Sequence, residues 1–220
     1  MLIGERMMDE KWKKSLKEYR NDRREEIVEA ALELFLEKDL ANVTMKDIVA
    51  NASISRVTLY KYFKSVHEIV FEIQMKVFRE MNQYLLQSMA KGENGIYRLK
   101  LLFEAMLVFF DKKPNYLRFM SLFDHYYRNT YPTSELEEKY KVFLKDEVTC
   151  FYVIREGVKD GSLRSDIDED LVISMVGNTL VGMGQRMAVR GHLIGREQDV
   201  NPKDVLQQVF NVLYEFLKAE

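Results

Sequence analysis

The stretch of residues 44–64 constrains the fold of this chain more than any other segment. Thr44 with Asp47 three residues on matches the start of a capping box, which predicts a short helix after Thr44. A small polar break follows, and Ser55 can cap a second helix whose apolar residues recur at four-residue spacing. Two short helices joined by a tight turn predict a helix-turn-helix.

The second helix has an outward side without acidic residues, since none occurs between Asp47 and Glu68. Such a surface suits entry into a DNA major groove. Arg56 and Lys61 are expected to reach base edges, because Arg or Lys to guanine is the commonest specific contact. The remaining candidate residues are expected to contact DNA phosphates. The alternative is that this segment is an ordinary polar helical surface. The full set of expected DNA-contacting residues is Thr44, Lys46, Ser55, Arg56, Thr58, Tyr60, Lys61, Tyr62 and Lys64.

Residues 58–64, reading TLYKYFK, resemble the recognition-helix signature of the TetR family of transcriptional repressors. Residues 44–49, reading TMKDIV, resemble the helix before it, and the spacing is similar over residues 24–69. The resemblance implies an all-α fold, with an N-terminal three-helix helix-turn-helix domain and a larger helical ligand-binding and dimerisation domain. It also implies a regulator that binds a palindromic double-stranded DNA operator as a dimer and is released by a small-molecule effector.

Four residues depart from the pattern of that family: Val49, Ser53, Val57 and Val66. Ser53 stands at the usual turn glycine, where positive φ would cost serine about 1 kcal/mol. Val66 replaces a lysine that would contact a phosphate. These departures leave open an alternative, a protein–protein adaptor or co-regulator that keeps the fold but no longer binds an operator. Whether such a regulator represses or activates transcription also remains open.

The composition excludes several classes of protein. Lys and Arg total 33 against 35 Asp and Glu, so any DNA contact must come from a local patch. Cys150 is the single cysteine, and no His or Cys cluster predicts a metal or other cofactor. The longest apolar run, residues 105–110, falls short of the ~20 residues of a membrane span, which favours a cytoplasmic protein. No nucleophile or phosphate-loop signature suggests an enzyme.

The sequence predicts three segments: residues 1–20 as a tail or helical extension, 21–66 as the helix-turn-helix domain, and 67–220 as the ligand-binding and dimerisation domain. The first segment and its continuation are basic, which fits either an arm on DNA phosphates or a solvated surface. Within the third segment, long helices are expected from Ser65 to about Ala90, from Ser134 to Glu156, and from Leu171 to about Arg190. The last predicted helix follows Asn201, and these final two helices look suited to a four-helix homodimer interface in the manner of the family.

The large domain is rich in aromatic residues and methionine, which more often form a core than a pocket. The family resemblance nevertheless favours an apolar ligand site. Its candidate residues are Phe103, Met106, Phe110, Phe119, Phe123, Tyr127, Tyr152, Met175, Asn178 and Met183. Polar groups that could orient a ligand are Glu104, His125, Asn178 and Arg186, and a buried, unpaired Glu104 would indicate a cationic ligand. Glycines 177, 182 and 184 predict the close approach of another backbone.

Overall fold

The computed structural model describes residues 2–219, and it describes the side chains of Trp12 and of residues 18–219. These residues form helices and connecting segments without a β-strand, apart from one isolated bridge between Leu163 and Lys218. The all-α prediction is therefore confirmed. The chain divides into two compact units, residues 1–73 and 74–220, and helix α4 contributes residues to both.

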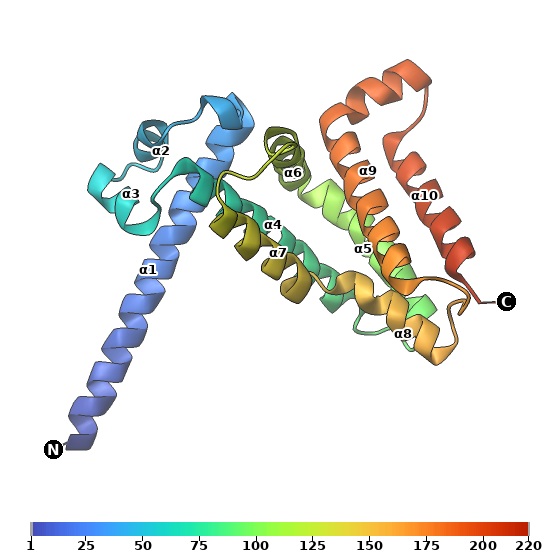
Figure 1. Cartoon of the computed structure of the whole chain (residues 1–220), viewed down its shortest axis with the longest axis horizontal. Coiled ribbons are helices and arrows are strands. Elements are labelled where there is room, and N and C mark those ends of the chain that lie inside the picture. The colour runs from blue at the N-terminus through green and yellow to red at the C-terminus, as the bar shows by residue number, and fades with distance from the viewer. Residues whose placement is uncertain (1, 220) are drawn as a thin grey trace. The chain divides into compact units, whose positions relative to one another are not determined.

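The first unit contains α1 (Leu2–Lys38), η1 (Leu40–Asn42), α2 (Met45–Asn51), α3 (Arg56–Tyr62) and the start of α4 (Val66–Met89) (Figure 1). Helix α1 takes in the segment expected as a tail or helical extension. Its apolar stripe is buried where α1 packs on α2 and η1, and α2 in turn packs on α3. The buried residues of this small core include Ile27, Val28, Ala31, Leu34, Phe35, Ile48, Leu59 and Phe63. Their packing holds α2 and α3 on α1 as a rigid unit.

The second unit contains the rest of α4, followed by α5 (Gly95–Lys112), α6 (Pro114–Tyr126), α7 (Ser134–Glu147), η2 (Cys150–Tyr152), α8 (Val153–Asp160), α9 (Glu169–Gln198) and α10 (Pro202–Leu217). Helix α9 packs on α6 and α10, and α5 packs on α8 and α10. Figure 1 shows α9 and α10 side by side, joined by a short connection. Among the described residues, no helix combines the length and apolar character needed to cross a membrane.

The helix predicted from Ser134 to Glu156 is interrupted, and this prediction was wrong. Helix α7 ends at Glu147, and α8 begins at Val153 after a short 3-10 turn. The reason lies on a different helix. The amide oxygen of Asn82 on α4 accepts the backbone N–H groups of Thr149 (2.9 Å) and Cys150 (2.7 Å). This buried side chain replaces the hydrogen bonds that a continuous helix would have made.

Within the protomer, Gly177 and Gly184 of α9 face aromatic side chains and not another backbone, so the prediction was wrong for these two glycines. A Cβ on Gly184 would lie 2.6 Å from the Phe110 ring, and one on Gly177 would lie 3.3 Å from the Phe151 ring. A Cβ on Gly182 would meet nothing within 4 Å. Two of these glycines therefore make room for aromatic rings. Helix α9 also continues past Arg190 to Gln198.

Candidate nucleic-acid interface

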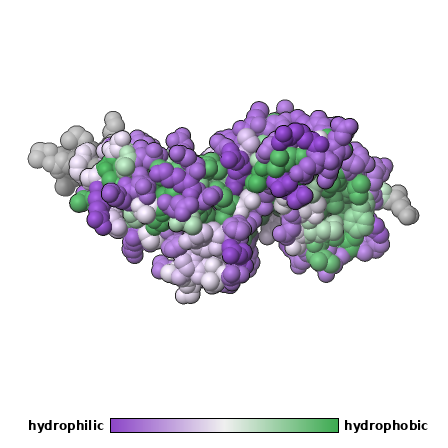
Figure 2. Space-filling model, turned by 90° about the horizontal axis from the view of Figure 1, so that it is seen from above, coloured by the Kyte–Doolittle hydropathy of each residue, from purple (hydrophilic) through white to green (hydrophobic). Residues whose placement is uncertain are grey.

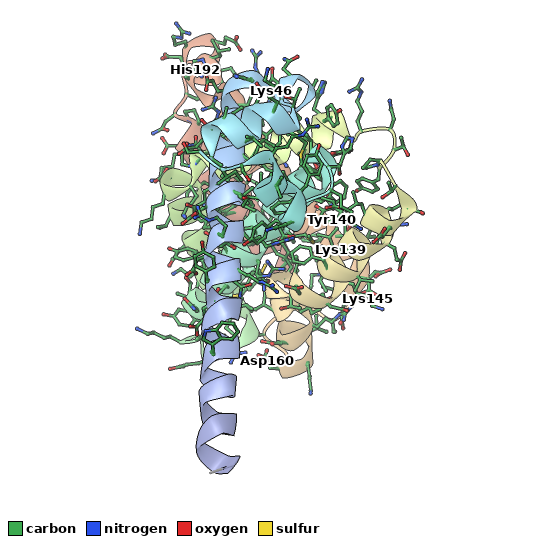
Figure 3. The ribbon with its side chains drawn as sticks, turned by 90° about the vertical axis from the view of Figure 1, so that its left-hand side faces the viewer. Lys46, Lys139, Tyr140, Lys145, Asp160 and His192 are labelled. Carbon is green, nitrogen blue, oxygen red and sulfur yellow. The ribbon has the colours of Figure 1, made fainter. Side chains whose placement is uncertain are left out.

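Helix α2 begins with the predicted capping box. The Thr44 hydroxyl accepts the N–H of Asp47 (3.3 Å), and the Asp47 carboxylate accepts the N–H of Thr44 (2.9 Å). The Thr44 hydroxyl also donates to the Asp47 carboxylate, and this hydrogen bond, with the one from the Thr44 N–H, holds the pKa of Asp47 below its usual value. Lys46 is exposed on the same helix (Figure 3). The carboxylate of Asp47 is thus held in the cap at the start of α2.

Helix α3 turns its apolar side inward and its cations outward. Ser55 caps it by accepting the N–H of Thr58 (3.0 Å), and Leu59 is fully buried. We define the α3 ridge as the exposed side chains of α3 and the residue two positions beyond its end, namely Arg56, Val57, Tyr60, Lys61 and Lys64. The Arg56 guanidinium lies 5.6 Å from the centre of the Tyr60 ring. The ridge contains no acidic side chain.

The other expected DNA contacts lie around this ridge. Thr44 and Ser55 are exposed at the starts of the two helices, while Thr58 and Tyr62 are half-buried. Sequence reasoning placed all nine residues in one interface, and the structure brings them together on one small unit. Their contact with DNA stays a prediction.

The turn between α2 and α3 contains a serine in the left-handed region. Ser53 has φ of 52°, the conformation for which glycine is favoured. We expect Ser53→Gly to stabilise the protein by about 0.5–1 kcal/mol, because the relief of strain exceeds the added freedom of the unfolded chain. Thermal denaturation measures the change. Ser53→Ala keeps the strain and is the control; a Tm for Ser53→Gly at or below that of Ser53→Ala contradicts this account.

Arg24 was not predicted to have a structural role, yet it fixes the end of α3. Its guanidinium donates to the Tyr62 carbonyl (3.2 Å) and to the Glu72 carboxylate of α4 (2.8 Å). It also lies 4.3 Å from the centre of the Phe63 ring. The arginine therefore ties α1 and α4 to the last turn of α3. Its partners are more than 35 residues away in sequence, so no local pattern could have revealed the contact.

A hollow with a volume of about 470 Å³ lies beside that last turn, lined by Arg20, Asn21, Arg24, Lys61 and Tyr62. Its lining is cationic, as the α3 ridge is, and it includes residues of α1 as well as of α3. The side chains of the basic residues Lys11, Lys13, Lys14 and Lys17 of α1, for which an arm on DNA phosphates and a solvated surface were both left open, lie outside the described residues.

The expected ligand residues of the second unit fall into separate groups. Phe103, Met106, Phe110, Phe119, Phe123 and Tyr127 are buried, Tyr152 and Met183 are half-buried, and Met175 and Asn178 are exposed. Phe123 and Tyr127 belong to one aromatic cluster, with ring centres 4.9 Å apart. Phe103 instead stacks on Phe210 of α10 at 5.2 Å. The structure therefore does not unite the ten residues in one site.

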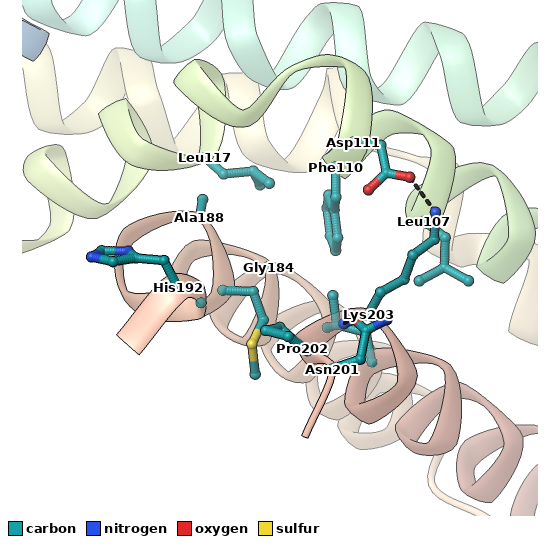
Figure 4. A pocket seen from close by; sticks show the side chains of 13 residues that line it. Leu107, Phe110, Asp111, Leu117, Gly184, Ala188, His192, Asn201, Pro202 and Lys203 are labelled. Atoms are coloured by element: carbon teal, nitrogen blue, oxygen red, sulfur yellow. Dashed lines mark hydrogen bonds and ion pairs between the residues drawn. The ribbon is translucent and has the colours of Figure 1, made fainter. Parts of the chain in front are cut away.

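Phe110 lines a groove of about 300 Å³ between α5, α6, α9 and α10 (Figure 4). Its ring faces Gly184, and an ion pair between Asp111 and Lys203 lies at one side. His192 of α9, which sequence reasoning did not select, lies at the opposite end.

The polar residues expected to orient a ligand point elsewhere. Glu104 is exposed and pairs with Lys100 at 4.0 Å, which removes the idea of a cationic ligand held by a buried Glu104. Asn178 donates to the Ser174 carbonyl of its own helix (2.8 Å). His125 and Arg186 are exposed as well. Within the described part of the chain, no cluster of three or more His, Cys, Asp or Glu side chains could hold a metal ion.

Comparison with known proteins agrees with the helix-turn-helix geometry. The family model described as "Bacterial regulatory proteins, tetR family" matches residues 27–73, which cover α2, α3 and the start of α4. The HTH-type transcriptional repressor KstR2 of Mycolicibacterium smegmatis is 25% identical over 167 residues, 71% of this chain and 75% of that protein. The chain is therefore similar to transcriptional regulators of the TetR family, most clearly over its helix-turn-helix residues.

Solved structures of transcriptional regulators show the same fold as this chain. The ketosteroid transcriptional regulator KstR2 of Mycobacterium tuberculosis has a TM-score of 0.61 at 21% identity, covering 90% of this chain and 96% of that one. The transcriptional regulator FadR of Bacillus subtilis, in complex with stearoyl-CoA, has a TM-score of 0.67 at 16% identity, covering 87% and 97%. The likeness extends over both units of the chain.

Proposed function

We propose that this protein is a ligand-responsive repressor of the TetR family that binds a palindromic operator as a homodimer and is released by a small molecule. The observation that carries the proposal is the α3 ridge, which is exposed, cationic and without acidic residues. Arg56 and Lys61 are long enough to reach guanine edges from a helix in the major groove. The surrounding hydroxyl and lysine groups suit phosphates.

The homodimer is supported by the exposed apolar residues of α9 and α10. Figure 2 shows hydrophobic side chains gathered on its right-hand side, where Figure 1 places these helices. The residues concerned include Leu171, Met175, Val189, Val212 and Phe216, which are 37–66% exposed. Large exposed apolar surfaces mark association sites. Two protomers are also what a palindromic operator requires.

We expect the double variant Val212→Asp with Phe216→Asp to be a monomer. These residues are 60% and 44% exposed and lie four apart on α10, so two carboxylates there would be desolvated in a dimer. Analytical ultracentrifugation measures the mass, with Asn211→Asp as a control on a neighbouring exposed position. Dimers formed by the double variant as readily as by wild type would exclude this interface.

The effector is proposed to be a predominantly apolar molecule of the acyl or steroid kind. This rests on the two solved relatives, one in complex with stearoyl-CoA and the other a ketosteroid regulator. The aromatic and methionine-rich interior of the second unit is compatible with such a ligand. The effector can shift the regulator only through different affinities for its two states.

Helix α4 offers a route from effector to DNA. It carries Glu72, which holds Arg24 and through it the last turn of α3. A displacement of α4 on ligand binding would alter this contact. Two recognition helices must lie about 34–36 Å apart, or a multiple, to reach successive major grooves, so small displacements weaken binding.

A gel shift with DNA from upstream of the protein's own gene tests the proposal. The expected result is a sequence-selective complex that weakens with salt, since Lys and Arg displace counterions from phosphates. A complex without sequence preference, or no complex, would instead support the adaptor that has lost operator binding.

A further inference from the structure

The buried side-chain amides of Asn82 and Gln74 on α4 differ in whether the amide oxygen accepts a hydrogen bond. Asn82 is 7% exposed, and its oxygen accepts two backbone N–H groups. Gln74, two turns earlier, is 1% exposed, and its Oε1 atom has no hydrogen-bond partner. Its Nε2 donates to the Tyr140 hydroxyl at 3.2 Å. Among the described residues, Gln74 Oε1 is the buried side-chain atom that has no hydrogen-bond partner.

An unpaired acceptor in a protein interior destabilises the fold, because it loses its hydrogen bond to water and gains none in return. Methionine has a similar length and would fill the same space without a polar atom. A glutamine at this position therefore needs a reason other than stability. For Asn82 the reason is structural, because its oxygen accepts backbone N–H groups where the chain is interrupted after α7. The structure offers no such backbone partner for Gln74 Oε1.

The surroundings of Gln74 are aromatic. The ring of Tyr140 lies 5.4 Å from that of Phe123 and 6.3 Å from that of Phe143. Tyr140 itself is only 5% exposed and projects from α7 (Figure 3). Burial raises the pKa of its phenol, against the opposing effect of the hydrogen bond from Gln74, so the hydroxyl stays neutral at physiological pH.

The same cluster continues to the protein surface. The Tyr131 ring lies 6.1 Å from those of both Tyr127 and Tyr140, and it belongs to the segment that connects α6 and α7. Tyr131 is half-buried and Tyr126 is 41% exposed. The aromatic cluster beside Gln74 therefore extends into a connecting segment and is not confined to packed helices.

We propose that Gln74 and Tyr140 form the hydrogen-bonding end of the effector site, and that its ligand is a mostly apolar, ring-containing molecule that donates an O–H or N–H to Gln74 Oε1. This inference rests on the proposed function, because it takes the bound ligand to be the effector of a ligand-responsive regulator. The aromatic cluster supplies the flat apolar walls, and the amide supplies orientation. Because Gln74 follows Glu72 by two residues on α4, an anchored ligand acts on the helix that holds Arg24.

The first test compares the stability of two single variants at one fixed protein concentration. Gln74→Met removes an unpaired acceptor, so its Tm should stay unchanged or rise by about 2–4 °C. Asn82→Met removes a paired one, so its Tm should fall by about 4 °C or more. A fall for Gln74→Met as large as that for Asn82→Met would mean that Gln74 has an ordinary structural role, and would overturn the proposal.

The second test measures binding by calorimetry with two probes, 2-naphthol and 2-methoxynaphthalene, in which a methyl ether replaces the O–H donor. Wild type should bind 2-naphthol about five-fold more tightly, the ratio for one neutral hydrogen bond. Gln74→Met should bind both equally. Equal binding of both probes by wild type, an unchanged ratio in Gln74→Met, or no binding of either probe each overturns the proposal.

A gel shift with Gln74→Met separates this inference from the proposed function. The variant should bind operator DNA as tightly as wild type does, because Gln74 lies outside the first unit. If wild type itself fails to bind an operator, the proposed repressor is wrong, while the probe-binding ratio still decides the role of Gln74. If operator binding is normal but the ratio is absent, only the present inference fails.

Discussion

Replacing Arg56 and Lys61 together by alanine is expected to weaken binding to the specific operator by about 10²–10⁴-fold. Each arginine or lysine contact to guanine contributes roughly 1–3 kcal/mol of discrimination, and the two side chains lie on separate turns of α3. Both are exposed, so the fold should not suffer. Fluorescence anisotropy with a labelled operator duplex at fixed salt measures the affinity.

The matched control removes the same amount of charge elsewhere. Lys139 and Lys145 are exposed on α7 in the second unit (Figure 3). Their double alanine variant should bind the operator within about three-fold of wild type, since exposed charges away from the contact act only through the screened field. If both double variants lose affinity equally, net charge rather than the α3 ridge governs binding.

Gly95→Ala is expected to cause the largest loss of stability, about 3 kcal/mol. A Cβ at this position would lie 2.0 Å from the Gly157 Cα and 2.4 Å from its nitrogen, and backbone atoms cannot move aside as side chains can. The N–H of Gly95 also donates to Asp160 at 2.7 Å, so a shift of α5 would break this contact. The Tm should fall by roughly 6–12 °C at this chain length.

Gly191→Ala is the control for the glycine experiment. A Cβ there would lie 3.6 Å from its nearest neighbour, Pro202, which is ordinary van der Waals contact, and the residue lies inside α9. Alanine is favoured over glycine in a helix interior by about 0.5–1 kcal/mol, so this variant should be at least as stable as wild type. Equal effects of the two substitutions would show that α5 and α8 do not approach as closely as the structure has it.

Local features of the helix-turn-helix could be predicted from the sequence. The caps at Thr44 and Ser55 act within three residues, and the inward position of Leu59 follows from helical periodicity. Even the strain at Ser53 follows from the turn. The family signature covers this same region, which explains why the interface was the most predictable part of the chain.

Features that depend on distant contacts could not be predicted. The break after α7 is made by Asn82, more than 60 residues earlier, and the last turn of α3 is held by Arg24. Glu104 and Asn178 belong to helices whose apolar residues are numerous enough to leave their exposed faces ambiguous. Gln74 gave no signal at all, because an unpaired buried oxygen is a property of packing and not of sequence.

The most direct test of the central claim is methylation protection of guanine N7 on the operator. This atom lies in the major groove, where the α3 ridge is proposed to bind. The account predicts protected guanines in two half-sites, centred 10–10.5 base pairs or a multiple apart, and their loss with the Arg56→Ala, Lys61→Ala double variant. Binding that leaves guanine N7 unprotected, or protection that persists in the double variant, would contradict it.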